Sequence, residues 1–281
     1  MHIRKKQPIA KIFIIIFIII YLIVTLFPIY WMVNTSFKSN RTAYKAPPEF
    51  FPNPITLENY KRLLNEDLTI LRFFFNSMVI GLGTVFLCLL IGGFAGYSLS
   101  RFNLPGKGFI MVFIMLSQLF PLAVLLIPLY IHFAKLGMLD TYYTVILAHS
   151  AITLPYSIWL LKGFIDTIPI EMEEAASIDG CSRIGILWRI IMRMIAPGLV
   201  TAGVTSFLMS FREFLYALTL TSTEASRPIS PGIQVYFMAV MSLRWANLMA
   251  ATTVAVIPVI LIYIFLQKYV VSGLTGGAVK G

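Results

Sequence analysis

Long apolar stretches alternate with short polar segments along most of the chain. A helix that spans a bilayer needs about 20 mostly apolar residues. Six stretches meet or nearly meet that length: Ile12–Val33, Phe73–Arg101, Gly108–Phe133, Thr141–Leu161, Met194–Leu220 and Trp245–Gln267. The pattern predicts an all-α integral membrane protein with six transmembrane helices, in contact with membrane lipid.

Two places depart from this regular pattern. Arg212 and Glu213 interrupt the fifth stretch with adjacent charges. A further apolar stretch, 228–243, is short and opens with Pro228, Pro231 and Gly232. A seventh span there would move the C-terminus to the other side of the membrane. We therefore interpret 228–243 as an external or re-entrant segment packed on the other helices.

Basic residues near the ends of the stretches predict the orientation, because loops rich in Lys and Arg stay on the cytoplasmic side. We expect both termini in the cytoplasm and one membrane domain that covers residues 1–281. Segment 34–72 becomes an external loop, although it carries several basic residues of its own. Segment 162–196 becomes a cytoplasmic loop, and 268–281 a cytoplasmic tail.

Composition agrees with a membrane location and argues against several other functions. Hydrophobic residues make up 58% of the chain and charged residues 12%, whereas soluble domains are about 25% charged. The net charge of +10 is spread over short segments without interleaved aromatic residues, which argues against nucleic acid as a partner.

The sequence offers no recognisable catalytic chemistry. It has no P-loop and no cysteine or histidine cluster with the spacing of a zinc site. His149 lies inside the fourth stretch, where a lone imidazole is expected to pack or to form hydrogen bonds. We expect no catalytic residue, metal or cofactor, so the chain is not predicted to be an enzyme.

The cytoplasmic loop carries the most informative local pattern. Pro169 precedes three acidic residues, which a helix macrodipole favours in a first turn. They are Glu171, Glu173 and Glu174. Gly180 can adopt the left-handed conformation that ends a helix, and Arg183–Ile195 predicts a second helix. From the residues alone, an interfacial hairpin and a docking element for a partner protein remain equally open.

This loop resembles the EAA loop of ABC-importer permeases. Glu174-Ala175-Ala176, then Gly180, then Ile190 follow the spacing of that motif. Met192 and Arg193 depart from it, since the family has Leu and Pro at these two places.

Other segments in the same order resemble carbohydrate permeases of the maltose-transporter type. They are Pro47-Pro48-Glu49-Phe50-Phe51-Pro52 with Glu58-Asn59-Tyr60, Trp159-Leu160-Leu161-Lys162-Gly163-Phe164 with Ile168-Pro169, and the C-terminal run Gly273–Gly281. The resemblance implies a type I ABC importer permease fold in the bacterial inner membrane. It also implies the function of a permease subunit for sugars or oligosaccharides, coupled to separate subunits that hydrolyse ATP.

The resemblance implies partners and contact residues as well. The partners are a second homologous permease, two ATP-binding subunits and an extracellular sugar-binding protein. The loop residues expected to dock on an ATP-binding subunit are Glu174, Ala175, Ala176, Asp179 and Gly180. The tail residues expected to reach between the two ATP-binding subunits are Gly276, Gly277, Val279 and Lys280.

Polar residues inside the stretches are candidates for the substrate pathway, because such groups face a cavity or another helix. They are Asn76, Ser77, Gln118, Arg212 and Glu213. Two alternative functions stay open: a permease of the same superfamily for another solute, and an ATP-independent secondary transporter. The latter needs an ion-coupling site and typically an internal repeat, and neither is evident.

Arg212 stands where related carbohydrate permeases carry a neutral amide within Trp-Asn-Glu-Phe. A charge within a span must be paired or face water, and consecutive helix residues do not face each other. Glu213 is therefore a poor partner for it. One interpretation pairs Arg212 with an acid of the partner permease or of a neighbouring loop. The other places it in the pathway, where it receives an anionic group of an acidic sugar.

Overall fold

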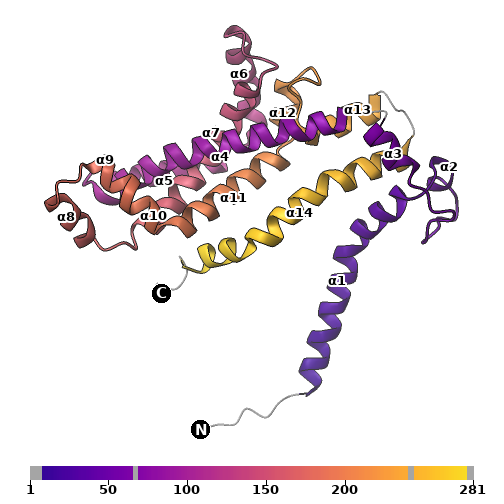
Figure 1. The fold of residues 1–281 in the computed structure, drawn as a ribbon, viewed down its shortest axis with the longest axis horizontal. Coiled ribbons are helices and arrows are strands. Elements are labelled where there is room, and N and C mark those ends of the chain that lie inside the picture. The colour runs from indigo at the N-terminus through magenta and orange to yellow at the C-terminus, as the bar shows by residue number, and fades with distance from the viewer. Residues whose placement is uncertain (1–7, 66–68, 240–243, 277–281) are drawn as a thin grey trace. The chain divides into compact units, whose positions relative to one another are not determined.

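The computed structural model describes residues 8–65, 69–239 and 244–276, which are mostly helical (Figure 1). The chain divides into two compact units. One comprises Met1–Leu68 and Tyr236–Val256, and the other comprises Thr69–Val235 and Ile257–Gly281. The helix that runs from 245 to 276 contributes to both units.

The first unit combines a long apolar helix with an ordered loop. α1 (Pro8–Ser36) is followed by the short helices α2 (Asn40–Ala43) and α3 (Glu58–Asn65), and the first part of α14 (Trp245–Gly276) completes the unit. Asn59 fixes the loop, because its amide donates to the carbonyl oxygens of Ser36 and Lys38 at 2.7 and 2.8 Å. The Lys38 ammonium lies 4.6 Å from the centre of the Trp31 ring. The part of the predicted external loop in this unit is thus fastened to the end of α1.

The second unit is built around three helices that run alongside one another, α4 (Thr69–Arg101), α7 (Tyr142–Ile165) and α11 (Ala196–Arg212). Small residues allow the close approach of α4 and α7. A Cβ added at Gly96 would lie 3.0 Å from the backbone nitrogen of Lys162. The remaining helices of this unit are α5 (Lys107–Leu116), η1 (Ser117–Leu119), α6 (Leu122–Lys135), α8 (Glu171–Ile178), α9 (Arg183–Ile186), η2 (Leu187–Ile191), α10 (Met192–Met194), α12 (Leu215–Leu220) and most of α13 (Ile229–Ala239).

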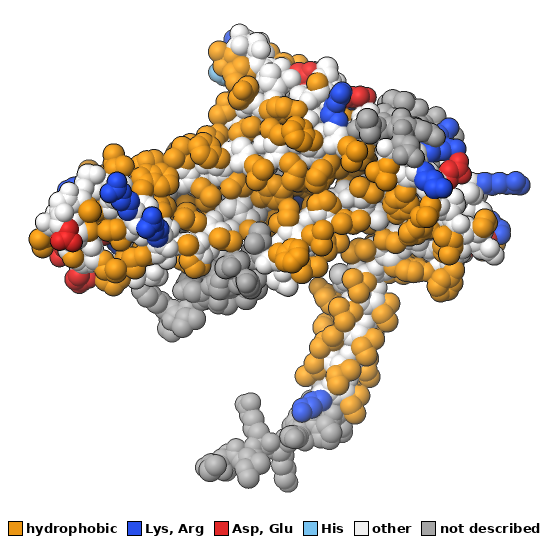
Figure 2. All heavy atoms as spheres, in the orientation of Figure 1, with side chains coloured by type: hydrophobic (Ala, Val, Ile, Leu, Met, Phe, Trp, Pro, Cys, Tyr) orange, Lys and Arg blue, Asp and Glu red, His pale blue; other side chains and the backbone are white. Residues whose placement is uncertain are grey.

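The number of spans agrees with the prediction. Among the described residues, four helical segments are long and apolar enough to cross a membrane: Lys11–Ser36, Thr69–Arg101, Tyr142–Ile165 and Trp245–Phe265. Two bent helix pairs bring the number to six when each pair is counted as one span. Figure 2 shows hydrophobic side chains along the long helices and charged side chains gathered over α8 and α9. The all-helical membrane fold with six spans is confirmed.

The third and fifth spans are not the continuous helices that the sequence predicted. The segments Lys107–Leu119 and Leu122–Lys135 meet at 94°, because Phe120 is extended and Pro121 cannot continue the preceding helix. In the fifth stretch, Glu213 is extended and separates α11 from α12. The segments Arg183–Met194 and Ala196–Arg212 also meet at 82°.

Segment 221–235 packs against the start of α4. Ser77 accepts a hydrogen bond from the Ile229 backbone nitrogen at 2.8 Å, and a Cβ on Gly232 would lie 2.4 Å from the Phe73 ring.

Asp140, in the turn before α7, holds the same segment. Burial raises the pKa of Asp140, but hydrogen bonds from Ser226, Thr223 and Ser222 outweigh burial and lower that pKa to about 2. Residues 229–239 form a helix, whereas 240–243 lie outside the described residues.

Candidate functional site

The loop between α7 and α11 folds as a short helix, a glycine turn and a second helical stretch. α8 begins just after Pro169 and carries its acidic residues in the first turn. Gly180 has φ +82°, a conformation that a side chain with a Cβ rarely adopts. Ser182 then caps α9, accepting the Gly185 backbone N–H at 3.2 Å. The helix–glycine–helix prediction is confirmed, with a stretch of π-helix at 187–191 inside the second part.

A buried ion pair anchors α8 to the end of α4. The Glu173 carboxylate pairs with Arg101 and accepts the Tyr97 hydroxyl at 2.8 Å. The same guanidinium donates to the carbonyl oxygens of Ile165 and Ile168 at 3.0 and 2.8 Å. Only 12% of the Arg101 side chain and 9% of the Glu173 side chain are exposed. One arginine therefore ties the end of α7 and the start of α8 to α4.

The sequence pattern alone does not point to this anchor. In the sequence, Glu173 is one of three acidic residues in the predicted first turn, and Arg101 is the last residue of a predicted span. The two residues lie far apart in the sequence, and no local pattern joins them. The available signal was an arginine at the predicted end of one span, opposite a loop rich in acidic residues.

α8 has an inward face and an outward face. Ala176 is buried in a core cluster with residues such as Ile165, Ile186 and Ile191. Glu174, Ala175, Asp179 and Gly180 are exposed. Of the five residues expected to dock on an ATP-binding subunit, Ala176 thus packs inward, because the loop closes its own core there. The other four remain accessible.

A second polar cluster lies between α7 and the break after α11. The Glu213 carboxylate accepts the backbone N–H groups of Tyr216 and Ala217, both at 3.0 Å, and therefore caps α12. His149 lies 3.0 Å from the same carboxylate through Nε2 and 2.7 Å from the Ser210 hydroxyl through Nδ1. His149 is 1% exposed. The expectation that it packs and forms hydrogen bonds is confirmed.

The break at Phe120–Pro121 and the break at Glu213 are joined by hydrogen bonds. Tyr216, in the first turn of α12, donates to the Leu122 carbonyl in the first turn of α6 at 2.9 Å. Gln118, beside the other break, donates to the Ile152 carbonyl of α7 at 2.9 Å. α7 thus holds one break through His149 and the other through Ile152.

The remaining pathway candidates fall into two groups. Asn76 and Ser77 are buried and bonded within the unit. The Asn76 amide donates to the carbonyl oxygens of Glu224 and Arg227 and accepts the Tyr142 hydroxyl. Gln118 and Arg212 are exposed, and each lies next to a helix break. A pathway role for any of these residues stays a prediction.

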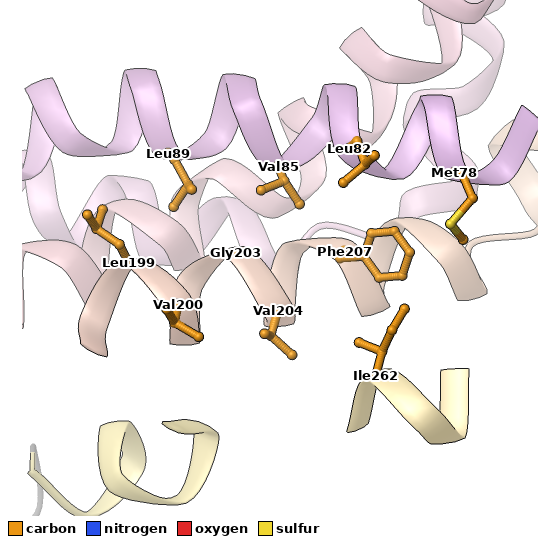
Figure 3. Close-up of a pocket in the computed structure, with 10 residues that line it drawn as sticks. All are labelled: Met78, Leu82, Val85, Leu89, Leu199, Val200, Gly203, Val204, Phe207 and Ile262. Atoms are coloured by element: carbon orange, nitrogen blue, oxygen red, sulfur yellow. The ribbon is translucent and has the colours of Figure 1, made fainter. Parts of the chain in front are cut away.

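An apolar cavity of about 510 Å³ lies between α4, α11 and the second half of α14 (Figure 3). Its lining includes Leu82, Val85, Val204, Phe207 and Ile262. No polar side chain lines it among the described residues. A sugar needs hydrogen-bonding groups that fix its hydroxyls, so this cavity is not a candidate sugar site.

The C-terminal end continues as a helix further than expected. α14 extends past Lys268 to Gly276, where the sequence predicted a tail that begins at 268. Gly276 is the last described residue. The predicted contacts of Gly277, Val279 and Lys280 lie outside the described residues.

Comparison with known proteins assigns the family. A model of binding-protein-dependent transport system inner membrane components matches residues 88–276. The chain belongs to this family. It is a membrane component of a transport system that depends on a binding protein, and it is a transport subunit rather than an enzyme.

Curated relatives extend this match over the whole chain. The sulfoquinovosyl glycerol transport system permease protein SmoH of Agrobacterium fabrum is 37% identical over 91% of this chain and 89% of its own length. The trehalose/maltose transport system permease protein MalG of Thermococcus litoralis is 34% identical over 99% of both chains.

A solved structure supports the fold. One chain of a bacterial ABC transporter that imports the acidic polysaccharide alginate superposes with a TM-score of 0.81, at 21% identity. The match covers 96% of this chain and 99% of that chain. The predicted ABC importer permease fold is therefore confirmed, as is the resemblance to carbohydrate permeases.

Proposed function

We propose that this chain is one of two related permeases in an ATP-driven importer of sugars or oligosaccharides. The curated relatives support sugars as the cargo class, because they are named for sulfoquinovosyl glycerol, trehalose or maltose, and diacetylchitobiose. These names differ, so they support a class and not one sugar. In this proposal residues 1–281 form a single membrane domain that contributes half of the translocation pathway.

The proposal includes the partners and the orientation that the family resemblance implied. Two ATP-binding subunits and a second homologous permease complete the complex in the bacterial inner membrane, and an extracellular binding protein delivers the sugar. Both termini and the 162–196 loop lie in the cytoplasm, and the 34–72 loop lies outside. Gly276, Gly277, Val279 and Lys280 reach toward the ATP-binding subunits.

The observation that carries the proposal is the anchored α8 with its exposed outer face. A force on Glu174, Ala175, Asp179 or Gly180 passes through the Arg101–Glu173 ion pair into α4 and α7 without bending a flexible loop. Such a rigid element allows nucleotide binding in a partner to bias two states of the pathway. We therefore assign ATPase coupling to this outer face, with Ala176 as the inward residue that seats α8.

The turn at Gly180 provides the test of coupling. Gly180→Pro cannot keep φ at +82° and loses the hydrogen bond from the Gly180 nitrogen to the Ser177 carbonyl. Gly180→Ala meets no atom within 4 Å, so it carries only the conformational cost of about 1–2 kcal/mol. We expect loss of transport-coupled ATP hydrolysis in the reconstituted complex for the proline variant and a partial loss for the alanine variant.

Gly163→Ala is the matched control, because Gly163 lies within α7 and an added Cβ meets nothing within 4 Å. This control should hydrolyse ATP in step with transport as the wild type does. If the Gly180→Pro complex assembled and still coupled ATP hydrolysis to transport normally, this turn would not be part of the docking surface.

A further inference from the structure

Arg212 is a cation inside a predicted span that no group of the described chain neutralises. Its side chain is exposed, and it makes no hydrogen bond or ion pair with any side chain or backbone group that the structure describes. The neighbouring carboxylate is already occupied, since Glu213 binds His149 and caps α12. The guanidinium therefore needs a partner from outside this chain.

The Arg212 guanidinium is not solvated by bulk water at the coupling-loop side of the membrane, because Arg212 lies at the far end of α11. Arg212 lies sixteen residues beyond Ala196, which is about 24 Å of helix. α12 adds a further six residues after the break at Glu213. A charge at such a depth faces a bundle interior or a water-filled cavity, or it pairs with an opposite charge.

The backbone around Arg212 has the form of a cavity-lining segment. Non-helical backbone within a membrane occurs where it is buried in protein or lines an aqueous cavity, and transporters commonly place substrate sites at interrupted helices. Glu213 is extended, while Arg212 beside it is exposed. The break is therefore held on one side by the protein and open on the other.

The backbone next to Arg212 is held in a defined geometry. Glu213, His149 and Ser210 form a continuous chain of contacts between α11 and α7. Tyr216 then links α12 to the second break, which is flanked by the exposed Gln118. A binding group works best when rigid elements and supporting hydrogen bonds position it. The helix break next to Arg212 is held in this way by Glu213 and His149.

We propose that Arg212 binds the carboxylate of an acidic sugar as that sugar crosses the membrane. The inference rests on the proposed function and makes it more specific, since it names the cargo as acidic. The planar guanidinium offers paired N–H donors that match the two oxygens of such a group. An acid supplied by the partner permease is the competing explanation, and the experiment separates the two.

The test uses the assembled importer with its binding protein in proteoliposomes. It measures ATP-driven uptake from an equimolar mixture of maltotriose and trigalacturonate, with mass spectrometry of the vesicle contents. We expect wild-type importer to take up trigalacturonate. Arg212→Asn should reduce that uptake roughly 10- to 100-fold, the loss of a charged hydrogen-bonded pair. Arg212→Lys should recover part of it, because lysine keeps the charge without the planar fork.

Arg193→Asn is the matched control, since Arg193 is exposed on the segment just before α11, at the opposite end from Arg212. It should leave trigalacturonate uptake unchanged. The inference would be overturned if the wild type took up maltotriose but not trigalacturonate, or if Arg212→Asn took up as much trigalacturonate as the wild type. Either result would leave the proposed function standing. Failure of Arg212→Asn to assemble would also overturn it in favour of an acid of the partner permease. A wild-type importer that takes up neither sugar, nor any of a wider panel of neutral and acidic mono- and oligosaccharides, would contradict the proposed function instead.

Discussion

Two pairs of adjacent charged residues behave alike at opposite ends of the second unit. In the loop, Glu173 turns inward and binds Arg101, while Glu174 is exposed. At the helix break, Glu213 turns inward and contacts His149, while Arg212 is exposed. In each pair one residue bonds within the protein and holds the fold, and the other faces outward.

The two anchors differ in the kind of partner that they use. Glu173 is paired with a permanently charged guanidinium, whereas Glu213 is held by an imidazole and two backbone N–H groups. The outward residues also differ in sign, so the loop presents a carboxylate and the break presents a cation. The same local arrangement therefore suits a protein partner at one end and, in our proposal, an anionic cargo at the other.

The largest expected effect comes from breaking the loop anchor. Arg101→Ala leaves the Glu173 carboxylate buried without its cation and removes donors from two carbonyl oxygens. Loss of one partner of a buried pair costs about 3–5 kcal/mol. We expect a strongly lowered melting temperature of the purified chain in detergent, measured by fluorescence-detected size exclusion.

Glu174→Gln is the control for that measurement, because this exposed neighbour makes no side-chain bond among the described residues. Its effect should stay within about 0.5 kcal/mol. If Arg101→Ala melted at the wild-type temperature, the ion pair would not be the anchor of α8.

A smaller effect is expected at the helix break. Glu213→Ala removes the cap of α12 and the partner of His149, and a hydrogen bond to a charged group contributes about 1.5–3 kcal/mol. His149→Ala should lower the melting temperature as well, and the double variant should lose less than the sum of the two because they share one contact. Additive losses would mean that the two side chains act independently.

Arg212→Asn belongs in the same series. An unpaired exposed side chain contributes little to folding, so this variant should melt within about 0.5 kcal/mol of the wild type. A large loss in the isolated chain would show that Arg212 has a partner within it.

The sequence predicted most of the fold because apolar length and capping residues are local signals. Pro169, the acidic first turn and Gly180 identified the helix and its turn without any knowledge of distant residues. The helix breaks were less visible. A window long enough to detect a span averages over Pro121, and the charges of Arg212 and Glu213 marked an interruption without showing that the helix ends there.

The candidate site was only partly predictable for the same reason. Nothing near Glu173 and Glu174 in the sequence says which of them faces Arg101, and nothing near Arg212 and Glu213 says which faces His149. The choice follows from how α4, α7 and α11 pack, which a local pattern does not contain. The motif nevertheless located the outward residues, and four of the five that it named are exposed.

Cross-linking from the outer face of α8 tests the central claim most directly. In a Cys181→Ser background, Ala175→Cys and Asn53→Cys both provide exposed thiols, while the native Cys88 is buried. A benzophenone maleimide attached to each thiol is photoactivated in the assembled complex, and the product is identified by mass spectrometry. The account predicts a covalent product with an ATP-binding subunit from position 175 and none from position 53. A product with an ATP-binding subunit from position 53, or its absence from position 175 in an intact complex, would contradict it.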